Sequence, residues 1–140
     1  MFEMSRPRLI ATLIAAATLG LAMVLANGIP PEPRALIRTV VPMILGAGLA
    51  QWLLFPLFTR REGAVGLALD VALWLGHIAL AGLFAGTLVM PGAGTILGPM
   101  VTLSLPLQSP VAALVYALGA ALGLRVIRRA RFAALATPPA

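Results

Sequence analysis

The sequence predicts an all-α protein, an integral membrane bundle of four transmembrane helices that forms one domain over residues 1–140. Hydrophobic residues make up 61% of the chain and charged residues 10%, whereas a soluble domain carries about 25% charged residues. The mean hydropathy is +1.03, and the chain has no cysteine. These features exclude an ordinary soluble enzyme, a disordered tail and a disulfide-stapled secreted domain.

Four apolar segments are long enough to cross a bilayer, which takes about 20 helical residues. They are 9–27, 35–58, 63–90 and 110–127. The proline-rich segment 28–33 ends the first helix, because proline lacks an amide donor and disfavours helix in the residue before it. The charged turn 59–63 makes an antiparallel hairpin of the second and third helices. Strands are excluded, since the alternation of a membrane barrel is absent.

The segment between the third and fourth helices, 91–109, carries no charge and three prolines. We expect an apolar connection at the membrane surface, because its apolar run 95–105 is too short to span the bilayer. Two alternatives remain open at this point. One is a re-entrant or broken helix that lines a cavity, which requires protein or water to cover its backbone. The other is a fifth crossing.

The distribution of arginines predicts the orientation, because positive residues favour the cytoplasmic side. All ten basic residues are arginines, and with four crossings eight of them flank the spans on one side. These are Arg6, Arg8, Arg60, Arg61, Arg125, Arg128, Arg129 and Arg131. Both termini are therefore expected in the cytoplasm, and a fifth crossing would break the pattern. The last four also suit contact with anionic lipid head groups. A rival interpretation makes the first span a signal peptide cleaved near Ala26.

Small residues on the predicted helices indicate close helix packing. Gly82 and Gly86 are spaced as GxxxG on the third helix, and Gly119 and Gly123 repeat the spacing on the fourth. Without side chains, two helix backbones approach closely and gain dispersion contact, which is the main attraction left in lipid. The pattern fits packing within the chain, and it also fits an interface with another subunit.

Asp70 is the one acidic residue inside a predicted span, and a carboxylate in lipid needs a partner. Gln51 lies at the same distance, about 14 Å, from the turn that joins their two helices. Tyr116 and Thr18 lie at similar depth, so the four side chains are expected to form one polar layer. Its role is a clamp of hydrogen bonds or a proton or ion site. An Asp70 that reaches Arg60 or Arg61 is the alternative.

His77, the only histidine, lies on nearly the same helix face as Asp70. A histidine beside a carboxylate suits a proton relay, and an imidazole nitrogen also suits an axial ligand of a haem or chlorophyll. The structural interpretation is a hydrogen bond to a neighbouring helix. In each case we expect His77 to face the bundle interior or a partner, since an imidazole needs hydrogen bonds in hydrocarbon.

The chain lacks the usual sets of catalytic residues: it has no Cys or Lys, no cluster with metal-ligand spacing and no paired carboxylates. We therefore expect a non-enzymatic accessory subunit of a multi-subunit transport or electron-transfer assembly, without cofactor, metal or nucleic acid. The alternative is a small homo-oligomeric transporter or channel with Asp70 and His77 along its path. Arginine usage and the Ala/Leu/Gly bias are typical of a high-GC bacterium, which places the protein in the inner membrane.

Overall fold

The computed structural model describes residues 6–28, 32–58 and 63–136, with side chains up to residue 130, and these residues form helices and short connections. The helices are α1 (Arg6–Asn27), α2 (Pro33–Leu54), the 3-10 turn η1 (Phe55–Leu57), α3 (Gly63–Val89), α4 (Ala93–Gln108) and α5 (Pro110–Ala136). Four of these, α1, α2 continued by η1, α3 and α5, are long and apolar enough to cross a membrane. The prediction of an all-helical chain with four helices able to span a membrane is confirmed.

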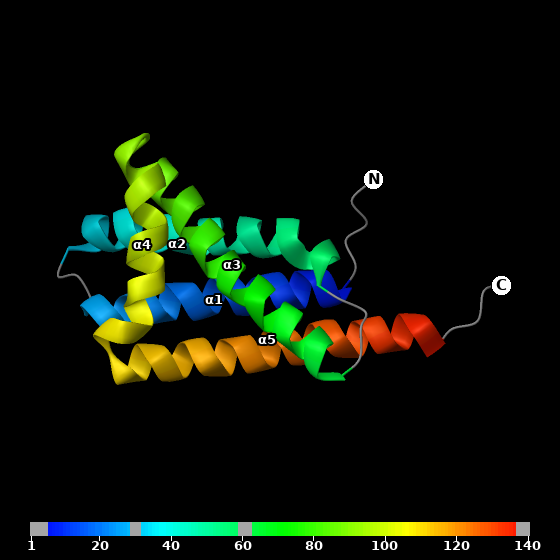
Figure 1. Ribbon diagram of the computed structural model, residues 1–140. Helices are drawn as coiled ribbons and strands as arrows, with labels where there is room; N and C mark the ends of the chain where they lie inside the picture. Colours follow the sequence, from blue (N-terminus) through cyan, green and yellow to red (C-terminus); the bar gives the residue numbers. More distant parts are fainter. Residues whose placement is uncertain (1–5, 29–31, 59–62, 137–140) are drawn as a thin grey trace.

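Three of the long helices share one direction. Helices α1, α2 and α5 lie alongside one another, with α1 in contact with both α2 and α5 (Figure 1). The start of α1 and the end of α5 lie at the same end of the molecule. Helix α3 runs obliquely across these three, so residues at equal sequence distance from a turn do not lie at equal height in the bundle.

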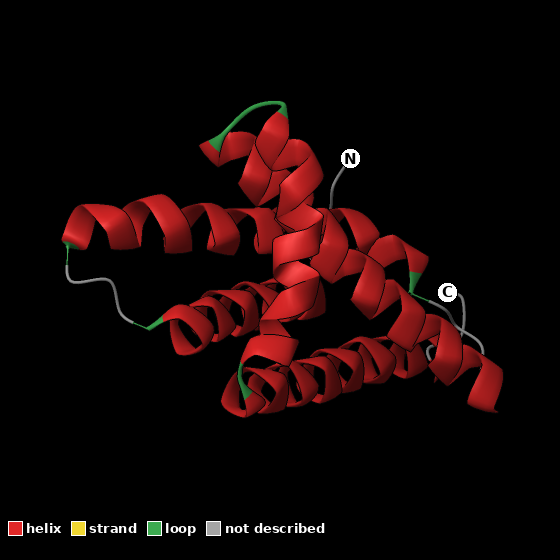
Figure 2. Ribbon diagram, turned by 60° about the vertical axis from the view of Figure 1, so that its left-hand side comes forward, coloured by secondary structure: helices red, strands yellow, loops and turns green. Residues whose placement is uncertain are grey.

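The segment 91–109, which was expected to be an apolar connection, contains helix α4. Helix α4 folds back against α3 and runs across α1 and α5 rather than along them (Figures 1 and 2). Its 16 residues measure about 24 Å, which is less than the hydrocarbon thickness. Pro99 and Pro106 lie inside the helix without ending it. At Pro106 a hydrogen bond from a neighbouring helix replaces the missing backbone bond.

Proline and glycine set the other boundaries. Pro56 stops the α-helical ladder of α2, which ends in the 3-10 turn η1. Gly92 has a φ of +86°, a conformation that suits glycine, and it reverses the chain between α3 and α4. Ser109 is extended and directly precedes the first residue of α5. The predicted turn with Arg60 and Arg61 lies outside the described residues, apart from Gly63.

The interior holds many alanines beside a few large buried side chains such as Leu19 and Ile127, and many other large aliphatic side chains point outward. Ala11, Ala15, Ala47, Ala50 and Ala81 are fully buried. The outer face of α2 carries a stripe of aliphatic residues at every fourth position, namely Ile37, Val41, Leu45, Leu49 and Leu53. In lipid, apolar side chains gain nothing by turning inward, so close backbone approach through alanine holds the helices together.

Candidate functional site

Asp70 forms an ion pair between α3 and α5. Its Oδ2 accepts a hydrogen bond from Nε of Arg128 at 3.2 Å. The Asp70 side chain is 1% exposed and that of Arg128 is 30% exposed. A carboxylate at this depth is stabilised by a paired cation, so the charge of Asp70 is used to join two helices.

The predicted hydrogen bonds from Gln51 and Tyr116 to Asp70 are wrong. The Gln51 amide is fully buried, and neither its nitrogen nor its oxygen has a hydrogen-bond partner among the described residues. The Tyr116 hydroxyl donates elsewhere, and Thr18 donates to the carbonyl of Ile14 in its own helix at 2.7 Å. The prediction assumed that residues at equal sequence distance from a turn lie at equal height in the bundle. This holds only for parallel helices, and α3 is oblique to the others (Figure 1).

Tyr116 supports the proline-containing part of α4. Its hydroxyl donates to the backbone oxygen of Thr102 at 3.0 Å. In a regular helix that oxygen accepts from the amide four residues later, but Pro106 stands there and has no N–H. The tyrosine on α5 therefore satisfies an acceptor that α4 cannot satisfy by itself.

Arg8 likewise satisfies a backbone oxygen of α2 that has lost its helical donor to a proline. One of its terminal nitrogens donates to the backbone oxygen of Trp52 at 2.6 Å, and Pro56 lies four residues after Trp52. The guanidinium also lies over the Trp52 ring, 4.0 Å from its centroid, in cation–π geometry. From the sequence, Arg8 was expected only to mark the topology, and Thr102 carried no prediction. A proline four residues after an acceptor is the sequence signal for both sites.

His77 faces the interior, as predicted, with 1% of its surface exposed. Its Nε2 lies 3.2 Å from the backbone oxygen of Ala47 on α2. A carbonyl oxygen only accepts, so Nε2 carries the hydrogen and Nδ1 of the neutral ring is left as an acceptor. In the part of the chain that the structure describes, Nδ1 has no hydrogen-bond partner.

Gln51 and Ala47 lie one helical turn apart on α2, so the unpaired amide of Gln51 and the docked His77 belong to one region of the α2–α3 interface. Buried polar atoms without partners are rare in proteins and call for a specific explanation such as bound water. This region is the candidate polar site of the bundle. Asp70 and Tyr116 are bonded elsewhere, to Arg128 and to the Thr102 carbonyl.

The glycines of α3 face α4. A Cβ added at Gly82 would collide with the backbone of Gly98, and one at Gly86 would collide with the backbone of Gly94. On α5, a Cβ at Gly119 would meet Thr18 of α1, and one at Gly123 would meet the ring of Trp74. All four glycines of the two GxxxG motifs therefore serve close contacts within this chain.

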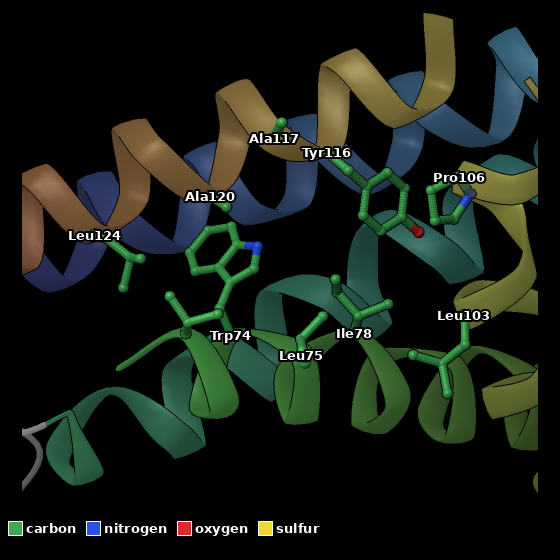
Figure 3. Close-up of a pocket in the computed structure, with 10 residues that line it drawn as sticks. Trp74, Leu75, Ile78, Leu103, Pro106, Tyr116, Ala117, Ala120 and Leu124 are labelled. Carbon is green, nitrogen blue, oxygen red and sulfur yellow. The ribbon is translucent and has the colours of Figure 1, made fainter. Parts of the chain in front are cut away.

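An apolar cavity of about 280 Å³ lies between α3, α4 and α5. Figure 3 shows Trp74, Leu75 and Ile78 of α3 on one side and Tyr116, Ala120 and Leu124 of α5 on the other. Leu103 and Pro106 of α4 close one end. A cavity with this lining suits hydrocarbon rather than an ion or a polar solute.

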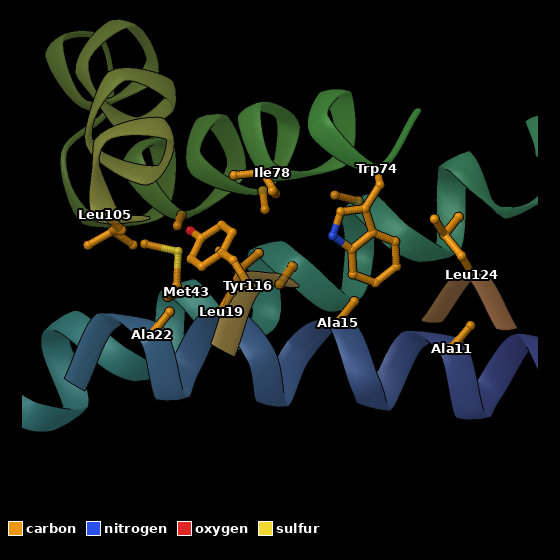
Figure 4. Packing of buried hydrophobic residues seen from close by; sticks show 14 of the residues in the cluster. Ala11, Ala15, Leu19, Ala22, Met43, Trp74, Ile78, Leu105, Tyr116 and Leu124 are labelled. Atoms are coloured by element: carbon orange, nitrogen blue, oxygen red, sulfur yellow. The ribbon is translucent and has the colours of Figure 1, made fainter. Parts of the chain in front are cut away.

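Trp74 fills the space that the small residues leave. It points from α3 toward α1, where Ala11 and Ala15 present only methyl groups (Figure 4). Its ring centroid lies 5.2 Å from that of His77, with the two planes tilted by 50°. The tryptophan thus separates His77 from Asp70 along the same face of α3.

The remaining site predictions concern metals and lipids. Among the described residues, no group of three or more His, Cys, Asp or Glu side chains could hold a metal ion. Arg125 and Arg129 are exposed on α5, while the side chain of Arg131 lies outside the described part of the structure. Comparison of the chain with protein-family models, with curated proteins and with solved structures finds no match.

Proposed function

We propose that this protein is a non-enzymatic accessory subunit of a multi-subunit transport or electron-transfer assembly in a bacterial inner membrane, with both termini in the cytoplasm. The main support is how its ionic groups are used. Asp70 is bonded to Arg128 and Arg8 to the Trp52 carbonyl, so both charges join helices of the same chain. A scaffold needs such fixed contacts, whereas a carrier needs groups that exchange partners.

The outer face of α2 is the proposed contact surface for the neighbouring subunit. Its stripe Ile37, Val41, Leu45, Leu49 and Leu53 is broad and aliphatic, and within the described chain no helix covers it. Packing of complementary side chains drives association of such faces in lipid.

Site-specific photocrosslinking in native membranes tests this proposal. A photoreactive amino acid at Leu49 on α2 is expected to capture one defined protein in fixed stoichiometry, whereas the same probe at Leu114 on the exposed face of α5 is not. Two differently tagged copies of the chain identify self-association. Capture of lipid alone from both positions would contradict the accessory role.

The second candidate function is a small homo-oligomeric transporter or channel, and the unpaired polar atoms of Gln51 and His77 favour it. Water at these atoms would form part of a path for protons. Purified protein in liposomes with an internal pH dye tests this candidate under an imposed potential. Proton flux that disappears in Gln51→Leu and persists in Gln108→Leu, an exposed glutamine of α4, would favour the transporter. Absence of flux in the wild type would exclude the proton path.

A further inference from the structure

A second groove, of about 210 Å³, lies between α2, α3 and α4 near the α3–α4 turn. Its walls are apolar and include three of the six methionines of the chain, Met23, Met43 and Met90. Methionine side chains are flexible and adapt to ligands of irregular shape. Leu97 and Val101 line the groove and are also half exposed, so the groove opens sideways toward the lipid.

Arg38 contributes the one charged side chain of this lining. It lies about 8 Å along α2 from the first residue of the helix, which places it inside the span found for α2. No ion pair joins Arg38 to a carboxylate among the described residues, Glu32 included. A cation in an apolar span needs an anion or must reach toward the head groups.

Arg34 stands one turn closer to the helix end, on the same side of α2 as Arg38. The two exposed arginines therefore lead from the lipid head-group region into the groove. This charge arrangement attracts an anion and disfavours a head group that carries its own ammonium ion.

We propose that this groove binds an acyl chain of an anionic phospholipid whose phosphate pairs with Arg38. The apolar walls accept the chain, and the guanidinium offers paired N–H donors to the phosphate oxygens. The site lies at the opposite end of α2 from Trp52 and η1, and so away from Arg125 and Arg129. The proposal does not depend on the accessory role, because a transporter would use the same lipid site.

Native mass spectrometry of the purified full chain in neutral detergent tests the site. Dioleoyl phosphatidylglycerol is the anionic probe and dioleoyl phosphatidylcholine the zwitterionic one. One phosphatidylglycerol is expected to remain bound, and Arg38→Gln is expected to weaken its binding about tenfold, the factor that one charge-assisted hydrogen bond supplies. Arg38→Lys is expected to restore part of the affinity, and Arg125→Gln, an exposed arginine of α5, to leave it unchanged.

A matched pair of substitutions tests the acyl chain. Leu97→Trp fills the groove and is expected to abolish retention, whereas Ile96→Trp, at a more exposed neighbour outside the lining, is expected to preserve it. Glycerol phosphate, the head group alone, is expected not to compete. Equal binding of the two lipids, equal loss in Arg38→Gln and Arg125→Gln, equal effects of the two tryptophans, or competition by glycerol phosphate would each overturn the proposal.

Discussion

Tyr116 on α5 donates its hydroxyl hydrogen to the backbone oxygen of Thr102 on α4 at 3.0 Å. This bond links α5 to α4, a helix that is too short to span a membrane. Because Pro106 removes the helical donor for that oxygen, the tyrosine is the partner that the carbonyl has in the described structure.

Removal of the Tyr116 hydroxyl is expected to destabilise the fold by leaving this carbonyl unpaired. We expect Tyr116→Phe to lower the free energy of unfolding by about 1.5 kcal/mol. Unfolding in mixed micelles, followed by circular dichroism, measures the change. In a Pro106→Ala background the helix regains its own donor, so the cost of Tyr116→Phe is expected to fall to less than half. An equal cost in both backgrounds would contradict this account.

The pair between Asp70 and Arg128 is expected to show strong coupling in a double-mutant cycle. Arg128→Gln leaves a buried carboxylate and is expected to cost about 2 kcal/mol, less than for a fully buried pair because Arg128 is 30% exposed. Asp70→Asn combined with Arg128→Gln is expected to cost less than the sum of the single changes by about 1 kcal/mol. Arg125→Gln is the control and is expected to change stability by less than about 0.5 kcal/mol. Strict additivity would argue against the pair.

Replacement of Gln51 is expected to stabilise the protein, in contrast to the substitutions above. Gln51→Leu keeps the side-chain size and removes two buried polar atoms that have no partner within the described chain. We expect it to raise the free energy of unfolding of the isolated protein by about 1 kcal/mol. Gln108→Leu, at an exposed glutamine that bonds to Ser104, is expected to have little effect. A loss of stability in Gln51→Leu would indicate that bound water pairs with the amide.

The tautomer of His77 follows from its contact with the Ala47 carbonyl. Since Nε2 donates to that oxygen, we expect the neutral Nε2–H form, with Nδ1 unprotonated. Solid-state ¹⁵N NMR of the chain in lipid distinguishes the two ring nitrogens, and His77, as the only histidine, needs no assignment. A proton on Nδ1 with none on Nε2 would contradict the contact, whereas protons on both nitrogens would contradict only the neutral form.

The contact of α3 with α4 is expected to tolerate no added methyl group at Gly86. A Cβ there would collide with the backbone of Gly94, so Gly86→Ala is expected to cost about 3 kcal/mol through forced separation of the helices. Gly76 lies in the same helix, and a Cβ there meets nothing within 4 Å. Gly76→Ala is expected to be neutral or stabilising by up to about 1 kcal/mol. Similar unfolding midpoints for the two variants would rule out the close contact.

The sequence was sufficient to predict the four membrane-spanning helices, but it was not sufficient to predict helix α4. Long apolar segments between charged or proline-rich breaks identify transmembrane helices, because lipid leaves the backbone no other way to pair its polar groups. Within helix α4 of segment 91–109, glycine and proline do not mark the end of a helix. Gly94 and Gly98 are contact points for α3 rather than helix breakers, and Pro106 is tolerated because Tyr116 lies on the next helix. Those partners are known only once the chain is folded.

The candidate site was predictable in part. Burial of His77 follows from the cost of an imidazole in lipid, and the structure confirms it. The partner of Asp70 was not predictable from depth, because the oblique path of α3 brings Asp70 to Arg128 rather than to Gln51. Crossing angles depend on side-chain packing along the whole interface, and spacing within one helix does not encode them.

Two backbone carbonyls, of Trp52 and Thr102, lack a helical donor because a proline follows four residues later, and their side-chain donors are synthesised at different times. Arg8 precedes Trp52 by 44 residues, so the hydrogen-bond donor is synthesised before the α2 carbonyl that it pairs with. For Thr102 the order is reversed, since its donor Tyr116 follows 14 residues later. Until α5 leaves the ribosome, α4 carries a bare carbonyl that hydrocarbon penalises. We therefore expect the nascent α4 to remain near water until α5 has been synthesised.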